Sequence, residues 1–145
     1  MSASNFREIN RRTVTPDLCD ELGHMNIQHY YATLSDGMFN VMGLMGMPKE
    51  DIPTRRTSLV LYKEEAEFID ELNDADLFYL ATALEHVGNK SIIFQHRFFN
   101  VQDGRKLFSS RFVAVNMNLD VRTSIPIPAN MKAAALKELP PYIED

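Results

Sequence analysis

The chain has 145 residues, a length typical of one domain, so we expect residues 1–145 to form a single domain. Its 15 basic and 20 acidic residues give a formal net charge of −5, and no basic run exceeds two residues, which argues against nucleic acid as a partner. A single cysteine excludes an internal disulfide and a cysteine-rich zinc site. No apolar run approaches the roughly 18–20 residues of a membrane span, and the charged segment at residues 1–12 has no apolar run behind it, so no signal peptide is predicted. We therefore expect a cytoplasmic protein that does not enter a membrane.

The first elements are a short strand, predicted over residues 7–14, and a long helix. Apolar residues between positions 27 and 45 recur with the spacing of one helical face, which predicts a helix there. Asn26 stands at the N-cap position, and Gly43 or Gly46 can end the helix before Pro48. Gly37 lies inside this helix, where a glycine favours close approach to a neighbouring element.

Four long strands are predicted next, over residues 57–69, 77–87, 91–101 and 106–117, because these runs are rich in Val, Ile, Phe, Tyr and Thr. Turn dipeptides separate the last three, which predicts an antiparallel meander. Each run is about twice the usual strand length, so we expect a strongly curved sheet. Prolines favour an extended segment over residues 125–128, and a terminal helix is predicted over residues 129–139.

The predicted strand over residues 91–101 is apolar on both faces. Ile92 and Phe94 point to one side, and Ile93 and Phe99 point to the other. A sheet that is apolar on both faces must be covered on both, and one long helix covers only one of them. We therefore expect a second copy of the chain at the other face or at an edge, in a homodimer or homotetramer.

The segment directly before the long helix brings together Asp20, Gly23, His24 and Asn26. Free backbone N–H groups at a helix N-terminus, together with the helix dipole, favour negative charge, which is the requirement for holding an oxyanion during acyl transfer. Asp20 could act as a general base or as a nucleophile, and Gly23 would let a ligand approach the backbone. The alternative interpretation is local: Asp20 or Asn26 caps the helix, and Gly23 turns the chain.

The pattern Asp20-x-x-Gly23-His24-x-Asn26-x-x-x-Tyr30 resembles the signature of hotdog-fold acyl-CoA thioesterases of the 4-hydroxybenzoyl-CoA thioesterase type. Beyond the motif, the chain is most similar in pattern to betainyl-CoA thioesterases, at residues 14–17, 43–46, 68–72, 108–115 and 125–128. The resemblance implies an α+β hotdog fold, in which a curved antiparallel sheet of five to six strands wraps around one long helix, with active sites at a dimer interface. It also implies hydrolysis of an acyl-CoA to a carboxylic acid and free CoA, with no cofactor.

The same resemblance implies roles for individual residues. Asp20 matches the catalytic acidic residue of the family, acting as base or nucleophile. Gly23 and His24 match the turn near the thioester carbonyl, with backbone N–H groups as oxyanion donors. Asn26 matches a polar position at the helix start. Tyr30 would belong to the core, to the acyl pocket, or to both.

The chain departs from betainyl-CoA thioesterases in the second predicted strand. Where that family has a histidine, this chain has Glu65, which could be a second catalytic or substrate-orienting group. The absent histidine argues against betainyl-CoA itself as the substrate. Alternatively, Glu64, Glu65 and Glu67 line a solvated edge. Strict alternation places Glu64, not Glu65, on the face of Ala66, unless a bulge changes the assignment.

The remaining candidates are more weakly marked. CoA carries phosphates, and Lys90 is one of the cations available to bind them, although it could equally be a surface charge. His86 and His96 have no partners at metal-ligand spacing, so no metal site is predicted. Cys19 is expected to be a small buried residue rather than a nucleophile. Two other functions stay open: a non-enzymatic acyl-CoA-binding domain, and an enoyl-thioester hydratase or dehydratase, although the usual Asp-x-Asn-Pro-x-His motif of such hydratases is missing.

Overall fold

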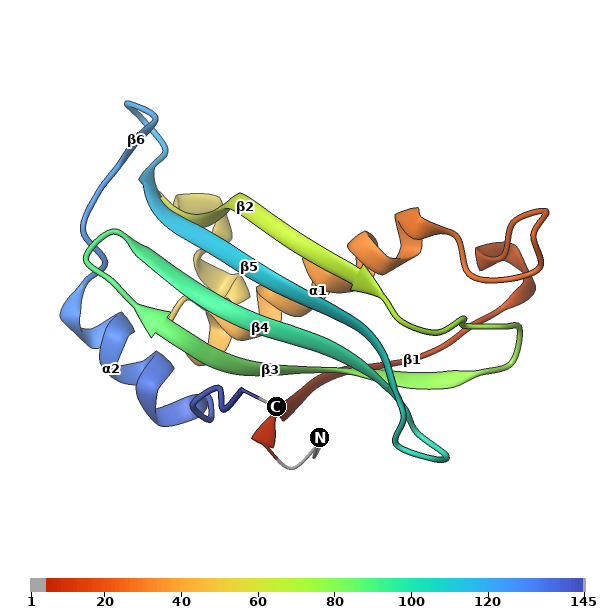
Figure 1. Cartoon of the computed structure of the whole chain (residues 1–145). Coiled ribbons are helices and arrows are strands. Elements are labelled where there is room, and N and C mark those ends of the chain that lie inside the picture. The colour runs from red at the N-terminus through yellow and green to blue at the C-terminus, as the bar shows by residue number, and fades with distance from the viewer. Residues whose placement is uncertain (1–4, 145) are drawn as a thin grey trace.

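The computed structural model describes residues 5–144 and contains a curved antiparallel sheet with one long helix along it (Figure 1). The sheet has six strands in the order β1-β3-β4-β5-β2, with β6 paired to the end of β5. The strands are β1 (Arg7–Thr13), β2 (Thr57–Phe68), β3 (Leu77–Val87), β4 (Ser91–Asn100), β5 (Lys106–Asn118) and β6 (Thr123–Ser124). The helices are α1 (Ile27–Leu44), α2 (Ala129–Glu138) and the 3-10 helices η2 (Pro16–Leu18) and η3 (Lys49–Thr54).

The strand connections confirm the predicted meander of β3, β4 and β5, and all the pairings are antiparallel. After α1 the chain forms β2 at one edge of the sheet, beside β5, and then returns to β3 between β1 and β4. Strands β2 to β5 are each 10–13 residues long. Because a sheet of such long strands twists and coils strongly, it curls around α1 as predicted (Figure 1).

Helix α1 begins and ends as its sequence predicts. The Asn26 side chain accepts a hydrogen bond from the backbone N–H of Gln28 at 3.1 Å, which makes it the N-cap. The chain reverses at Gly46, whose φ of 88° is a conformation that favours glycine. Gly37 faces the sheet, and a Cβ built there would overlap Leu80 Cδ2. The absence of a side chain therefore lets α1 lie directly on β3.

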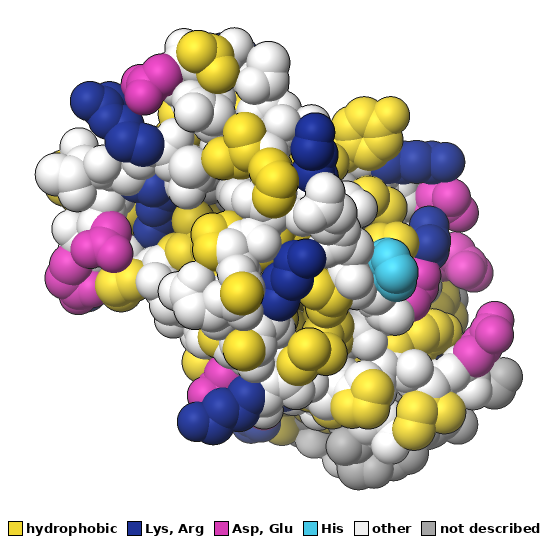
Figure 2. All heavy atoms as spheres, turned by 90° about the vertical axis from the view of Figure 1, so that its left-hand side faces the viewer, with side chains coloured by type: hydrophobic (Ala, Val, Ile, Leu, Met, Phe, Trp, Pro, Cys, Tyr) yellow, Lys and Arg dark blue, Asp and Glu magenta, His cyan; other side chains and the backbone are white. Residues whose placement is uncertain are grey.

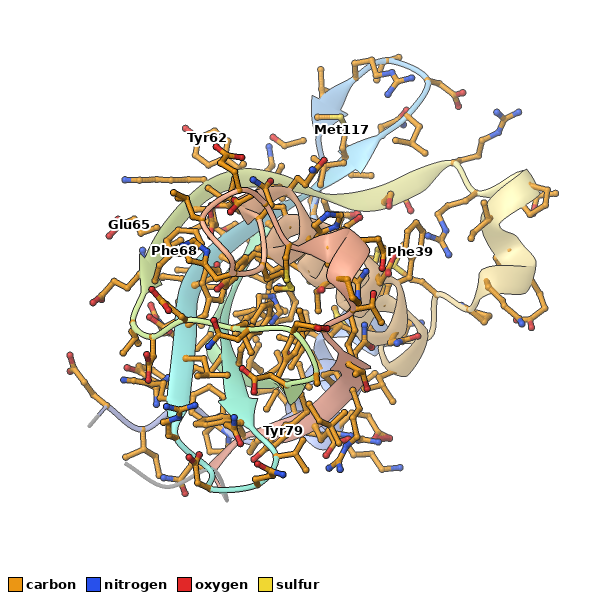
Figure 3. The ribbon with its side chains drawn as sticks, turned by 90° about the vertical axis from the view of Figure 1, so that its right-hand side faces the viewer. Phe39, Tyr62, Glu65, Phe68, Tyr79 and Met117 are labelled. Atoms are coloured by element: carbon orange, nitrogen blue, oxygen red, sulfur yellow. The ribbon has the colours of Figure 1, made fainter. Side chains whose placement is uncertain are left out.

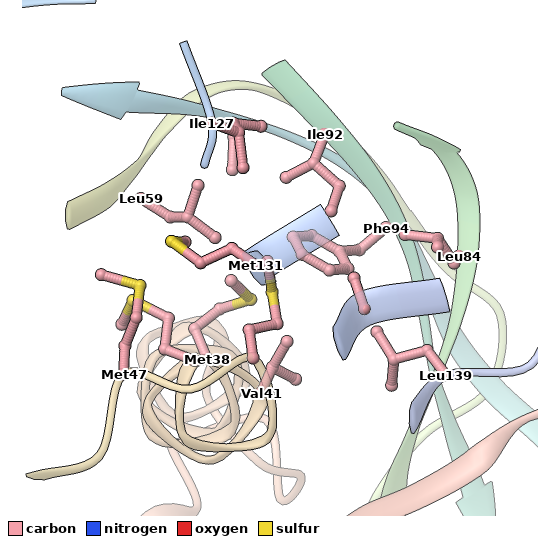
Figure 4. Close-up of a cluster of buried hydrophobic side chains, with 14 of the residues drawn as sticks. Met38, Val41, Met47, Leu59, Leu84, Ile92, Phe94, Ile127, Met131 and Leu139 are labelled. Atoms are coloured by element: carbon pink, nitrogen blue, oxygen red, sulfur yellow. The ribbon is translucent and has the colours of Figure 1, made fainter. Parts of the chain in front are cut away.

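Two hydrophobic clusters lie between α1 and the sheet. One surrounds the C-terminal half of the helix and contains Met38, Val41 and Phe94, together with side chains of α2 (Figure 4). The other surrounds the N-terminal half and includes Tyr30 and Phe98. Burial of each large apolar side chain contributes about 1.5–3 kcal/mol, so these clusters fix the helix on the sheet along its whole length.

A third cluster lies on the outer face of the sheet, away from α1. Phe99 on β4 packs there against Phe6, and Tyr142 lies beside them. The Arg97 guanidinium carbon lies 4.6 Å from the centre of the Phe6 ring. The chain itself thus covers part of the face for which a second copy was predicted. Coverage of the rest by a second copy stays a prediction.

Candidate active site

The loop before α1 makes a tight turn at the predicted motif. The Gly23 N–H donates to the Asp20 carbonyl at 3.0 Å, and the Leu22 N–H donates to Asp20 Oδ1 at 2.9 Å. Gly23 has a φ of 86°, and a Cβ there would meet nothing within 4 Å. The turn therefore needs glycine for its backbone conformation, while the space above it is open.

Asn26 connects this loop to the helix. Its amide Nδ2 donates to Asp20 Oδ2 at 2.9 Å, while its Oδ1 caps α1. The local interpretation is therefore confirmed for Asn26, and the N-cap of α1 is also the group that holds the Asp20 carboxylate in place. With one hydrogen bond at each oxygen, the Asp20 carboxylate has a fixed orientation.

These hydrogen bonds determine the charge of Asp20. Donation from the Asn26 amide and, next, from the Leu22 N–H favours the ionised form, which lowers the pKa of Asp20 below its usual value. The carboxylate is consequently ionised at neutral pH. It can take up a proton or attack a carbonyl carbon, but it is not a proton donor at that pH.

Backbone N–H groups lie next to this carboxylate. The N–H of Gly23 is occupied by the turn, whereas those of His24 and Ile27 have no acceptor in the part of the chain that the structure describes. Ile27 is the first residue of α1, where the helix dipole reinforces the attraction for negative charge. Of the backbone N–H groups predicted from the sequence to face a substrate, that of Gly23 is therefore engaged within the turn.

A cavity of about 530 Å³ opens beside the loop, and we refer to it as the motif cavity. Its volume lies within the range of small-molecule sites. Asp70 at the far wall is paired with Arg105 at 2.9 Å. The lining residues are Asp20, His24, Met25, Asn26, Ile27, Tyr30, Phe68, Ile69, Asp70 and Glu71. The motif cavity thus brings together four of the predicted site residues with the end of β2.

Tyr30 belongs both to the core and to the cavity wall. Its side chain is buried, stacks on Phe98 with ring centres 5.6 Å apart, and meets the edge of Phe68 at 5.0 Å. Burial raises the pKa of Tyr30, so its hydroxyl is protonated at neutral pH. Phe68 is not among the site residues predicted from the sequence. Its place at the end of a predicted strand gave no sign that this end would lie against the helix start.

The structure places Glu65 away from the motif cavity. Its side chain is 67% exposed on the side of β2 turned away from α1, and its Oε1 lies 4.0 Å from the Lys63 ammonium (Figure 3). Glu64 instead faces the helix, where its Oε1 accepts a hydrogen bond from the Tyr31 hydroxyl at 3.0 Å and its Oε2 one from Ser110 at 2.7 Å. Within one chain, therefore, Glu64 rather than Glu65 lies on the helix side.

Lys90 also lies apart from the motif cavity. It is in the turn between β3 and β4, at the opposite end of the sheet from the loop before α1 (Figure 1). Figure 2 looks onto that end, where hydrophobic side chains alternate with basic and acidic ones. Lys90 therefore lies far from the motif cavity of its own chain. Its predicted role in binding CoA phosphates would require the motif cavity of another copy of the chain.

A second polar set lies beneath the middle of α1. His96 on β4 is fully buried, and its Nδ1 lies 2.8 Å from the hydroxyl oxygen of Thr82 on β3, while Ser110 is its neighbour on β5. Its Nε2 has no hydrogen-bond partner among the described residues. Burial lowers the pKa of His96 to about 3, so the ring is neutral.

The pKa of the Cys19 thiol is shifted in the opposite direction to that of the neighbouring Asp20 carboxylate. Burial raises the pKa of Cys19, and its Sγ lies 3.8 Å from the Thr15 carbonyl oxygen. Since the thiolate is the reactive form, this environment disfavours a nucleophilic role. Within residues 5–144, no three His, Cys, Asp or Glu side chains are grouped to hold a metal ion.

The model of the thioesterase-like superfamily matches residues 14–135, which include the whole motif cavity. The chain belongs to this superfamily. The enzyme class predicted from the sequence, a thioesterase, is thereby confirmed at the level of the family. No curated protein matches the sequence significantly. In the described part of this thioesterase-like chain, the helices are too short or too polar to cross a membrane.

Solved structures share the fold of this thioesterase-like chain. A hypothetical protein from Staphylococcus aureus, solved in complex with CoA, has a TM-score of 0.84 and 17% identity, over 97% of this chain and 90% of its own. A gentisyl-coenzyme A thioesterase has a TM-score of 0.77 and 21% identity, over 87% and 98%. A 1,4-dihydroxy-2-naphthoyl-CoA thioesterase from Synechocystis has a TM-score of 0.77 and 12% identity, over 89% and 95%. The predicted hotdog fold is therefore confirmed.

Proposed function

We propose that this protein hydrolyses an acyl-CoA thioester in the motif cavity, releasing a carboxylic acid and free CoA. The observation that carries the proposal is the placement of an ionised, doubly hydrogen-bonded Asp20 carboxylate next to the unpaired N–H at the start of α1. Membership of the thioesterase-like superfamily supports this reaction, and so does the likeness to a structure solved with CoA.

The thioester carbonyl oxygen would lie at the Ile27 N–H, where negative charge on it is stabilised as the carbonyl carbon becomes tetrahedral. As a general base, Asp20 takes a proton from water while the water oxygen bonds to the carbonyl carbon. The carbon–sulfur bond then breaks, and the CoA thiolate leaves and takes up a proton. As a nucleophile, Asp20 would expel the thiolate directly and form a mixed anhydride, which water then cleaves.

We also infer that the active form is a homo-oligomer assembled at the β2 edge. Strand β2 ends the sheet, and its side chains Leu61, Tyr62 and Phe68 are about half-exposed or more. An edge strand that exposes apolar side chains can pair with another chain. Because Phe68 also lines the motif cavity, a partner at this edge would lie beside the site. Analytical ultracentrifugation of the wild type and of Tyr62→Glu tests this: the variant should shift toward monomer.

The decisive experiment measures thiol release from a panel of acyl-CoAs with short, medium and aromatic acyl groups. The wild type, Asp20→Asn and the matched control Glu21→Gln are compared, since Glu21 is exposed and does not line the cavity. Asp20→Asn should lower kcat/KM by about 10²-fold or more, and Glu21→Gln should leave it unchanged. Unchanged hydrolysis in Asp20→Asn would refute the mechanism. CoA binding without turnover in the wild type would favour the non-enzymatic alternative.

A further inference from the structure

A second cavity, of about 370 Å³, lies in the groove between α1 and β2, and we call it the α1–β2 cavity. Its lining consists of Tyr31, Leu34, Ser35, Met38, Phe39, Met42, Ser58, Leu59, Leu61 and Phe112. These side chains carry no charge, and most are aliphatic, thioether or aromatic. The composition suits an aliphatic chain and gives no group that would pair with a phosphate.

The two cavities follow one another along the same groove. The motif cavity has Tyr30 of α1 and Phe68 of β2 in its wall. Further along, the α1–β2 cavity lies between Met38 on the helix and Leu61 on the strand. Because β2 runs in the opposite sense to α1 here, the residues from Phe68 back to Leu61 accompany the helix from Tyr30 onward.

One pair of side chains crosses the groove between the two cavities. The Tyr31 hydroxyl donates to Glu64 Oε1 at 3.0 Å, and Glu64 Oε2 accepts from Ser110, whose side chain is fully buried in the sheet. We call this contact the Tyr31–Glu64 bridge. Hydrogen bonds to a carboxylate are stronger than those between neutral groups, so the bridge holds the two side chains together across the groove.

The position of the bridge determines the room available for an acyl group. Tyr31 lies four residues after Ile27, which corresponds to about 6 Å along the helix axis. An acyl group whose carbonyl oxygen is held at the Ile27 N–H therefore reaches the bridge after a few carbon–carbon bonds. Met42 lies eleven residues beyond Tyr31, so the groove continues for about 16 Å more.

We propose that the Tyr31–Glu64 bridge sets the length of the acyl chain that the protein accepts, and that the α1–β2 cavity is an extension of the acyl site that the bridge closes off. This inference rests on the proposed function, and it makes short acyl groups the substrate class. Removing the bridge should admit longer aliphatic chains. The proposal makes Tyr31 and Glu64 determinants of specificity rather than catalytic residues.

The test measures binding of non-hydrolysable S-alkyl-CoA thioethers, from ethyl to dodecyl, by calorimetry. For the wild type, affinity should rise to about butyl and then level off. In Tyr31→Ala, it should continue to rise by up to about fourfold for each further methylene that enters the apolar cavity. Glu64→Ala removes the other half of the bridge and should act in the same direction. Leu136→Ala, a truncation at a distant exposed position on α2, should keep the wild-type profile.

A second variant tests whether the added affinity comes from the α1–β2 cavity. Ser35 lines that cavity and is exposed, so adding Ser35→Phe to Tyr31→Ala should fill the space and restore the levelling at butyl. The proposal is overturned if wild-type affinity climbs to dodecyl with the slope of Tyr31→Ala. It is equally overturned if both bridge variants, with melting temperatures near that of the wild type, still level off at butyl.

This readout separates the inference from the proposed function. Binding of thioethers requires no turnover, so a wild-type profile that levels off and a variant profile that rises support the bridge even if no acyl-CoA is hydrolysed. Absence of thioether binding at every chain length in all variants would overturn the inference together with acyl-CoA as the ligand. Hydrolysis of a dodecanoyl-CoA by the wild type as fast as butyryl-CoA would overturn the bridge alone.

Discussion

Two polar sets lie along α1, one at its start and one beneath its middle. Each contains a group with a lowered pKa, but one group is kept charged and the other is kept neutral. The Asp20 carboxylate is half-buried, and both of its oxygens accept hydrogen bonds. His96 is fully buried, with one nitrogen at Thr82 and the other unpaired among the described residues. The pKa values of both groups are lowered, Asp20 by hydrogen bonds to its charged form and His96 by the loss of water.

The two causes have different consequences for function. Lowering the pKa of an acid keeps it charged, whereas lowering the pKa of a base keeps it neutral. The start of α1 thus presents a charge that lines the motif cavity, and the middle of the helix covers a neutral ring that is fully buried. Titratable residues in one fold therefore have to be judged by what surrounds them, and His96 is structural by this criterion.

The largest expected effect concerns acid stability. Below pH about 6.5 an unfolded histidine binds a proton that the folded His96 does not bind until pH about 3, so the free energy of unfolding should fall as the pH drops between these values. The maximum slope for one such group is about 1.4 kcal/mol per pH unit. Urea denaturation of the wild type and His96→Gln at several pH values measures it. The glutamine variant should lose this part of the slope, and equal slopes would show that His96 is not the cause.

Gly37 tests whether the helix is what keeps water from the buried set. A Cβ at this position would overlap the Leu80 side chain, which is fully buried, so Gly37→Ala should lift α1 from β3. We expect a loss of about 1–3 kcal/mol in the free energy of unfolding, as for other overpacked core positions. The matched control is Gly43→Ala on the same helix, where a Cβ meets nothing within 4 Å and the higher helix propensity of alanine should stabilise the protein. Destabilisation of equal size in both variants would contradict the close contact.

The main elements follow from local sequence, whereas one feature of the groove between α1 and β2 does not. Asn26, Gly37 and Gly46 each play the role that their neighbours in the sequence predict, because caps, close contacts and left-handed turns are local requirements. Strict alternation places Glu64 on the face of Ala66, and the structure confirms this placement. Alternation does not give which earlier residues of β2 share that face, because the pairing of β2 with β5 has a register shift between Leu61 and Lys63. That shift moves the alternation by one residue, so Leu61 and Glu64 face the same side.

The cover of the outer face is a second feature that local patterns do not reveal. Phe6 and Tyr142 are far apart in the sequence, and each lies outside a predicted strand or helix. They reach Phe99 only because the folded sheet places both segments on its outer face. Sequence periodicity identifies a face that needs covering, but it does not say which segment covers it.

The smallest expected effect separates the two roles of Asn26. In Asn26→Ala the helix loses its cap and Asp20 loses a hydrogen-bond donor, so the free energy of unfolding should fall by about 1 kcal/mol and the acid limb of kcat/KM should move to higher pH. Asn26→Ser keeps a capping oxygen but has no amide to donate to Asp20. It should therefore move the acid limb in the same direction while nearly keeping the wild-type stability. If the serine variant leaves the acid limb in place, the Leu22 N–H alone suffices to hold the carboxylate ionised, and Asn26 belongs to the helix rather than to the reaction.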